Sequence, residues 1–78
     1  MMMGGGAMVE VTAGNGHRYS VGYSGAPIHI GKDVMPCGGR MFRLWHGYGY
    51  ECMECGHTED RKEMERVVEN GRKALARA

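Results

Sequence analysis

Residues 36–57 read PCGGRMFRLWHGYGYECMECGH and contain all three cysteines of the chain. Two residues separate Cys52 from Cys55, a spacing at which a tight turn can direct two sulfur atoms at one tetrahedral ion. A glycine directly follows Cys37 and another follows Cys55, which lets the backbone wrap closely around each thiol. This stretch therefore predicts a structural zinc site.

The segment between the cysteines predicts a β-hairpin that brings them together. Residues 40–45 are expected to form one strand, residues 46–49 a turn, and residues 50–51 the start of the returning strand. One cysteine turn then precedes the hairpin and the other follows it, so both lie at the same end of the ribbon. Thiols that are distant in the sequence thereby meet in space, which is the geometric argument for a metal.

The length of the chain also favours a metal. A chain of 78 residues makes one small domain that buries too little apolar surface to be comfortably stable by packing alone. A disulfide would leave one of three cysteines unpaired in an oxidising compartment, so a metal is the better candidate for the additional cross-link. No stretch resembles a signal peptide or approaches the length of a membrane span, and we expect a cytoplasmic protein.

The N-terminal part predicts a second hairpin. Residues 1–7 are expected to be disordered, and residues 8–78 to form the single domain. Residues 8–12 and 17–23 alternate between apolar and polar side chains, as two paired strands do. A three-residue loop, with Gly16 in a left-handed conformation, would pair residues 11 with 19 and 9 with 21 and keep the apolar faces together. His17, beside this loop, is expected to face solvent.

The remaining segments complete an α+β fold with a small antiparallel sheet. Residues 28–30 predict a short third strand that ends at Gly31. The segment from about 58 to 77 predicts one C-terminal amphipathic helix, with Asp60 and Glu63 at capping-box spacing. Its apolar positions recur at helical spacing and comprise Met64, Val67, Val68, Gly71, Ala74 and Leu75. Gly71 implies either close packing of the helix at that point or fraying of its last turns.

The cysteine stretch resembles the zinc-ribbon group, in which two Cys-x-x-Cys-Gly knuckles flank a β-hairpin and clamp one zinc. Residues 52–57 match the second knuckle fully, and the resemblance covers about residues 34–57. The first knuckle is degenerate, since Cys37 is present but the position three residues earlier is Val34, which cannot bind metal. The resemblance implies three ligands, Cys37, Cys52 and Cys55, and leaves the fourth to come from elsewhere.

Several residues are candidates for the fourth zinc ligand. His29 is the first choice, because the strand that carries it leads into the degenerate knuckle. His57 is the second choice. It ranks below His29 because the backbone after a knuckle cysteine usually turns its amides, and not its side chain, toward the sulfurs. Asp33 and His46 follow. A water molecule, a ligand from a second chain and a site without metal stay open as alternatives.

Other interpretations of the cysteines are weaker. The thiols would serve as small buried apolar groups in one alternative, and Cys52 with Cys55 would form a redox pair in another. The helix that normally starts directly after the first cysteine of such a pair is not predicted here. A catalytic zinc would use three protein ligands and water. No motif places a general base, however, and so small a domain offers little pocket, so we expect no enzymatic activity.

The hairpin between the cysteines is also the candidate partner-binding surface, through Arg40, Arg43, Trp45 and Tyr48. A net charge of +1 favours a protein partner, as for a small adaptor, regulator or inhibitor that docks on a larger assembly. The alternative is a nucleic-acid-binding zinc ribbon, whose binding would weaken with salt. In the plainer interpretation, Phe42, Leu44 and Tyr50 are core and the arginines are solvated. Homodimerisation through a sheet edge or the apolar helix face is a further alternative.

Overall fold

The computed structural model describes residues 7–44 and 49–77. The described residues form six strands and one helix, namely β1 (Met8–Thr12), β2 (Arg18–Gly22), β3 (Ile28–Lys32), β4 (Met35–Arg43), β5 (Gly49–Cys52), β6 (Thr58–Asp60) and α1 (Arg61–Arg77). Each strand pairs antiparallel with the next along the chain, so the sheet order is β1-β2-β3-β4-β5-β6. The predicted α+β class is therefore confirmed. Among these residues, no helix has the length and apolar character needed to cross a bilayer.

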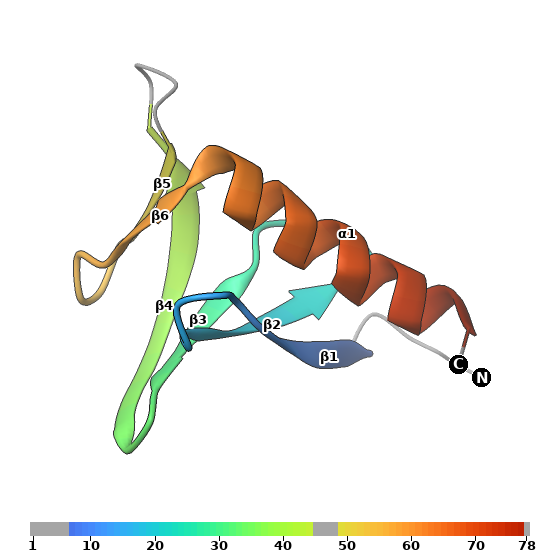
Figure 1. The fold of residues 1–78 in the computed structure, drawn as a ribbon, viewed down its shortest axis with the longest axis horizontal. Helices are drawn as coiled ribbons and strands as arrows, with labels where there is room; N and C mark the ends of the chain where they lie inside the picture. The colour runs from blue at the N-terminus through green and yellow to red at the C-terminus, as the bar shows by residue number, and fades with distance from the viewer. Residues whose placement is uncertain (1–6, 45–48, 78) are drawn as a thin grey trace.

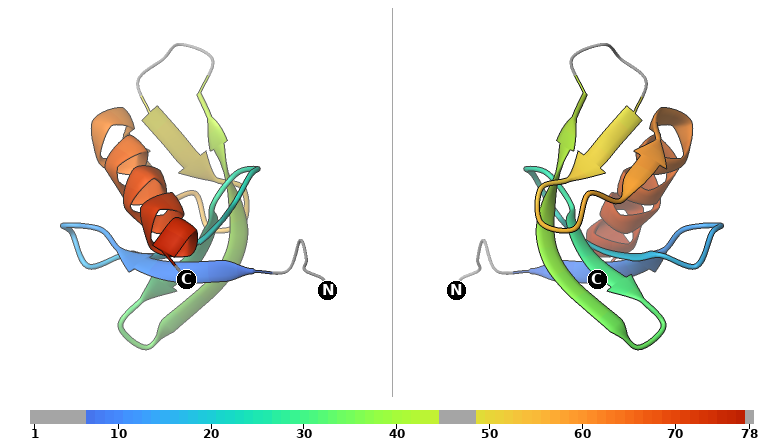
Figure 2. Two further views of the ribbon diagram at one scale, coloured as in Figure 1. Left: turned by 90° about the vertical axis from the view of Figure 1, so that its right-hand side faces the viewer. Right: turned by 90° about the vertical axis from the view of Figure 1, so that its left-hand side faces the viewer.

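Strand β4 connects two parts of the sheet. Its first residues pair with β3 and its last residues pair with β5. The strand is long and bent, so that the β5–β6 ribbon turns away from β1 and β2 (Figure 1). Helix α1 lies across one face and contacts β1, β2, β5 and β6 (Figure 2). The helix thus holds the two parts of the sheet together.

The N-terminal hairpin has the predicted register. Val11 pairs with Tyr19 and Val9 pairs with Val21. Gly16 has a φ of 90°, the left-handed conformation that the three-residue loop requires. Tyr19 and Val21 are fully buried as a result. The alternation of apolar residues was sufficient to fix this register, because a shift by one residue would expose both side chains.

The C-terminal helix begins later than predicted. Residues 58–60, expected to supply the cap at the start of the helix, form strand β6 and pair with β5, which buries Glu59 between two exposed neighbours. Asp60 caps the helix that follows, since its Oδ2 accepts the amides of Lys62 at 3.0 Å and Glu63 at 3.4 Å. The Glu63 carboxylate accepts the amide of Gly14 at 2.7 Å, so it ties the first hairpin to the helix.

The helix packs closely against β2 at Gly71. A Cβ atom at this position would lie 2.7 Å from Val21 Cβ and Cγ1, which is far inside van der Waals contact. Close packing, and not fraying, therefore accounts for this glycine. The helix residues Met64, Val67, Gly71 and Leu75 are buried, and the core that they join contains Ala13, Tyr19, Val21, Met41 and Cys52.

The central hairpin differs from the prediction in two ways. Phe42, expected in the core, is 43% exposed, and the buried side chain of that strand is Met41. Cys37 lies within strand β4 and not in a turn before it. His29 pairs with Gly39, and Gly31 pairs with Pro36. Between these two pairs, β4 therefore has one residue more than β3. This bulge holds Cys37, and a bulge bends its strand and changes the direction of its side chains.

Candidate metal centre

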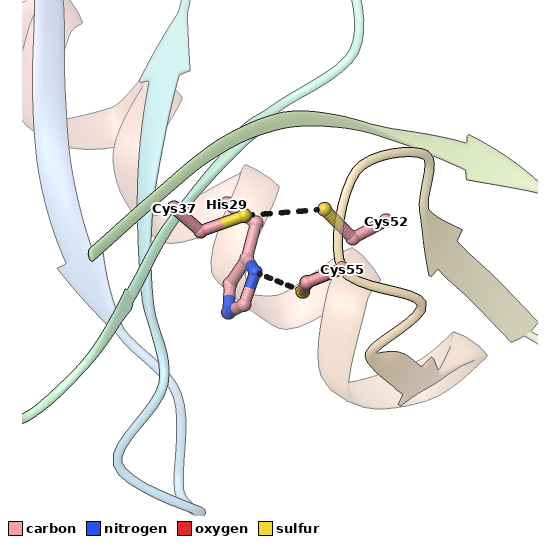
Figure 3. A group of neighbouring side chains, drawn as sticks. All are labelled: His29, Cys37, Cys52 and Cys55. Atoms are coloured by element: carbon pink, nitrogen blue, oxygen red, sulfur yellow. Dashed lines mark hydrogen bonds between the residues drawn. The ribbon is translucent and has the colours of Figure 1, made fainter. Parts of the chain in front are cut away.

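The fold brings together a group of three thiols and one imidazole. His29 comes from β3, Cys37 from β4, Cys52 from the end of β5, and Cys55 from the turn before β6. Their side chains point toward one another (Figure 3). One donor atom from each residue lies within 4.8 Å of all the others. The Cys37 and Cys52 sulfurs are 3.6 Å apart, and His29 Nδ1 lies 3.5 Å from Cys55 Sγ. We call these residues the Cys3His cluster; their donor atoms lie close enough together for metal binding.

The Cys3His cluster is partly enclosed. His29 is 2% exposed and Cys52 is 1% exposed, whereas Cys37 is half-buried and Cys55 is exposed. All three cysteines are free thiols. The separation of 3.6 Å between Cys37 and Cys52 is well beyond the roughly 2.05 Å of a disulfide bond. The cluster therefore opens to solvent on the side of Cys55.

The turn after β5 directs backbone amides at its two sulfurs. Burial raises the pKa of the Cys52 thiol, but hydrogen bonds from the amides of Cys55 and Glu54 outweigh it, and the pKa falls below its usual value. The amide of His57 lowers the pKa of Cys55, but desolvation and the neighbouring thiols raise it overall. Gly56, at a φ of 80°, closes the turn by donating to the Cys52 carbonyl at 3.0 Å.

The three thiols of the Cys3His cluster affect one another's ionisation. Negative charge on one sulfur opposes ionisation of the next, because the Cys55 thiol lies beside Cys52 and Cys37. Thiolates are the metal-binding form of cysteine, and a bound cation removes their mutual repulsion. A cation at the centre would therefore convert three competing thiols into three ligands.

A glycine on β4 allows the turn to approach the sheet. Gly39 is buried and pairs with His29 across the β3–β4 ladder. A Cβ atom on Gly39 would lie 2.3 Å from Cys52 Sγ and 2.7 Å from Glu54 Cβ. The space that a side chain would occupy is filled by the Cys52 sulfur. This glycine therefore decides whether Cys52 can reach His29 and Cys37.

The surroundings of two imidazoles, those of His29 and His17, favour the neutral form. Burial, followed by the nearby His57 and His17 imidazoles, lowers the pKa of His29 below its usual value of 6.5. Burial, followed by His57, lowers the pKa of His17 in the same direction. Neutral imidazole is the form that binds metals. The electrostatics of the cluster therefore agree with its donor chemistry.

These pKa shifts predict that acidification destabilises the fold. Because the two folded-state pKa values lie below 6.5, the unfolded chain binds more protons below about pH 6.5, and stability falls as the pH falls through that region. Release of a metal by protonated ligands acts in the same direction. Denaturant unfolding at about pH 7.5 and about pH 5.5, at equal ionic strength, measures the effect. An equal or larger unfolding free energy at the lower pH would contradict it.

A second histidine group adjoins the Cys3His cluster. The His17 ring stacks on that of His57 with centroids 3.7 Å apart and an interplanar angle of 8°. His17 Nδ1 is 2.9 Å from His29 Nε2. His57 Nε2 lies 3.0 Å from the Tyr19 hydroxyl and 3.2 Å from Glu59 Oε1. The expectation that His17 faces solvent is thus wrong, since the side chain is half-buried against His29.

The sequence singled out His29 and His57 as candidate ligands, but it did not place His17 beside them. A signal was present, because the predicted register of the first hairpin places His17, Tyr19 and Val21 on one face of a strand. Tyr19 then pairs with His29 on β3. Because β3 is the next strand of the sheet, His17 and Tyr19 lie on the face that also carries His29.

The other predicted site residues are not members of the Cys3His cluster. The His57 side chain points to Tyr19 and Glu59, and Asp33 is exposed with a φ of 54° in the turn between β3 and β4. Of the predicted partner-binding residues, Arg40 and Arg43 are exposed on β4. His46, Trp45 and Tyr48 fall outside the described residues. An open depression of about 390 Å³ borders the cluster, and its lining includes His17, Lys32, Asp33, Cys55 and His57.

Comparisons of the chain with protein-family models, with curated proteins and with solved structures give no match.

Proposed function

We propose that this chain is a zinc-stabilised, non-enzymatic interaction module that binds a larger protein. The observation that carries the proposal is the Cys3His cluster. Three cysteines and one histidine form a common donor set for structural zinc, and soft thiolates favour zinc over magnesium or calcium. The residues that would hold the ion are His29, Cys37, Cys52 and Cys55.

The separations within the cluster suit a tetrahedral zinc site. Bond lengths of about 2.3 Å to sulfur and about 2.0–2.1 Å to nitrogen require sulfurs about 3.8 Å apart and a sulfur and a nitrogen about 3.6 Å apart. The corresponding distances are 3.6 Å between Cys37 and Cys52 and 3.5 Å between Cys55 and His29. These two separations are close to the tetrahedral values, and all four donor atoms lie within 4.8 Å of one another.

A structural role is favoured over a catalytic one. Catalytic zinc keeps a coordination position open for water, whereas four protein donors fill a tetrahedron. The chain is also small, and zinc binding contributes free energy that its limited core does not supply. Zinc would act here by linking β3, β4 and the turn after β5.

A protein partner is favoured by the apolar side chains at the turns. Val34 is 89% exposed and Met35 is 71% exposed at the turn between β3 and β4, and Met53 is 62% exposed in the turn after β5. Exposed apolar groups are suited to protein contacts, and a net charge of +1 provides little attraction for a polyanion. The exposed Arg40 and Arg43 favour the second candidate function, nucleic-acid binding.

The first test is metal content together with metal-dependent folding. Elemental analysis of the purified protein is expected to give about one zinc per chain. Circular dichroism is expected to lose the helical signal with a strong chelator and to regain it with zinc but not with magnesium. Metal-free protein with an unchanged spectrum would overturn the zinc-stabilised module.

The second test addresses the partner. Affinity capture with the wild-type chain is compared with capture by the double variant Val34→Asp/Met35→Asp. The control is Met8→Asp, which adds a charge at an exposed methionine on β1, away from the turn. A protein retained by the wild type and the control but lost from the double variant supports the proposal. Binding to oligonucleotides that weakens with salt and with Arg40→Ala/Arg43→Ala would favour the nucleic-acid alternative.

A further inference from the structure

His29 has two ring nitrogens that face different groups. Its Nδ1 lies 3.5 Å from Cys55 Sγ, within the Cys3His cluster, and its Nε2 lies 2.9 Å from His17 Nδ1. If Nδ1 binds the metal, the proton of the neutral ring must be on Nε2. That N–H then donates to His17 Nδ1, which must be unprotonated to accept it.

His17 is held in place from two sides. Its backbone carbonyl accepts the amide of Ala13 at 2.8 Å, and its own amide donates to Asn15 Oδ1 at 3.1 Å. Asn15 Nδ2 in turn donates to Glu59 Oε1 at 3.1 Å, which ties the loop to β6. These bonds fix the backbone of His17, and the imidazole itself stacks on the His57 ring with centroids 3.7 Å apart.

The His57 ring, which supports His17 by stacking, has a fixed orientation as well. Tyr19 donates its hydroxyl proton to Glu59 Oε1 at 2.5 Å, and an ionised carboxylate can only accept. His57 Nε2, which lies 3.2 Å from the same oxygen, must then carry a proton. Tyr19 is fully buried and Glu59 is 6% exposed, so the support for the stacked rings is rigid.

The three histidines could instead hold a second metal ion, but their geometry opposes this. Two nitrogens on one tetrahedral ion would be about 3.3 Å apart. The distance of 2.9 Å between His17 and His29 fits a direct hydrogen bond better. Moreover, His17 and His57 stack almost face to face at 8°, and the nitrogen lone pairs of parallel rings lie in parallel planes and do not converge readily on one ion.

We propose that His17 is a positioning residue of the zinc site, which accepts the Nε2 proton of His29 and thereby fixes Nδ1 as the metal-binding nitrogen. The inference rests on the proposed zinc site. Hydrogen bonds from the second nitrogen of a ligating histidine orient the ring and raise its basicity, and their loss typically lowers metal affinity 10–100-fold. The chain thus uses a surface loop of its first hairpin to strengthen a site on β3, β4 and β5.

The test compares two variants of nearly equal shape. His17→Asn keeps an oxygen close to the position of Nδ1, whereas His17→Leu removes the acceptor, and both remove the stacking with His57. Zinc affinity is measured by chelator competition on the full chain. We expect His17→Leu to bind zinc about 10–100-fold more weakly than wild type, and His17→Asn to recover most of that loss. Equal affinities of the two variants would overturn the inference.

A second measurement on the wild-type protein does not depend on the folding of a variant. Long-range ¹H–¹⁵N NMR of the zinc-loaded chain reports the protonation of each ring nitrogen. We expect metal-bound Nδ1 and protonated Nε2 in His29, and unprotonated Nδ1 in His17. A proton on His17 Nδ1, or two zinc ions per chain with the His29 Nε2 proton lost, would overturn the inference.

The two proposals fail in different ways. A wild-type chain that binds no zinc would overturn the zinc-stabilised module, and this inference with it. A chain that binds one zinc through the Cys3His cluster, with His17→Leu as tight as His17→Asn, would overturn the role of His17 alone.

Discussion

Replacement of Cys52 by serine is expected to unfold the protein at 25 °C. Cys52 is both a member of the core and a donor of the Cys3His cluster. Structural zinc contributes about 10–16 kcal/mol of apparent binding free energy in small zinc domains, which matches or exceeds the roughly 5–15 kcal/mol net stability of an ordinary domain. If zinc binds as proposed, loss of one ligand would remove much of this contribution. Circular dichroism and zinc analysis of the purified Cys52→Ser variant measure the effect.

Two comparisons separate loss of metal from loss of packing. Met53→Ser places the same side chain one residue further along the turn, where the side chain is 62% exposed, and should leave both the spectrum and the zinc content unchanged. Wild-type protein treated with a chelator should resemble Cys52→Ser if the metal dominates. A Cys52→Ser variant that melts within a few degrees of the wild type would show that packing alone holds the fold.

Gly39→Ala is expected to weaken both metal binding and folding. The added Cβ atom would lie 2.3 Å from Cys52 Sγ and 2.7 Å from Glu54 Cβ, so the turn after β5 must move away from β4. Overpacking of this kind typically costs about 1–3 kcal/mol. Displacement of Cys52 separates it from His29 and Cys37 as well, and we expect zinc affinity to fall by about tenfold or more, since outer-shell changes alone reach 10–100-fold.

The neighbouring glycine provides a matched control. Gly38 lies in the same strand, and a Cβ atom there would meet no heavy atom within 4 Å. Gly38→Ala should therefore leave zinc affinity unchanged and alter stability by less than about 1 kcal/mol. Chelator competition and thermal unfolding of the two variants are compared side by side. Equal behaviour of Gly38→Ala and Gly39→Ala would refute the close approach of Cys52 to β4.

Local patterns were enough to predict much of the fold. Strict alternation in residues 8–12 and 17–23 determined the register of the first hairpin, because only one pairing keeps Val11 and Tyr19 on the buried face. The helical spacing from Met64 to Leu75 likewise determined the buried face of α1. These features depend on neighbours within one hairpin or one helix, and such neighbours are visible in the sequence.

The prediction failed where a segment has two local solutions. Residues 58–60 carry cap and helix-start signals, yet they pair with β5 because that strand offers an unpaired edge beside them. Cys37 sits next to two glycines that suit a turn, yet the segment continues as a strand with a bulge. In both places long-range pairing, which local propensity does not encode, decided the outcome.

The sequence by itself therefore determined an α+β fold, the hairpin register and the Cys-x-x-Cys turn, since each follows from short-range spacing. It also singled out His29 as the first candidate to join the three cysteines. Only the tertiary structure brought His29 within 3.5 Å of Cys55 and within 2.9 Å of His17. The direction of those side chains depends on the β4 bulge, on the missing side chain of Gly39 and on the packing of separate strands, and these are properties of the assembled sheet.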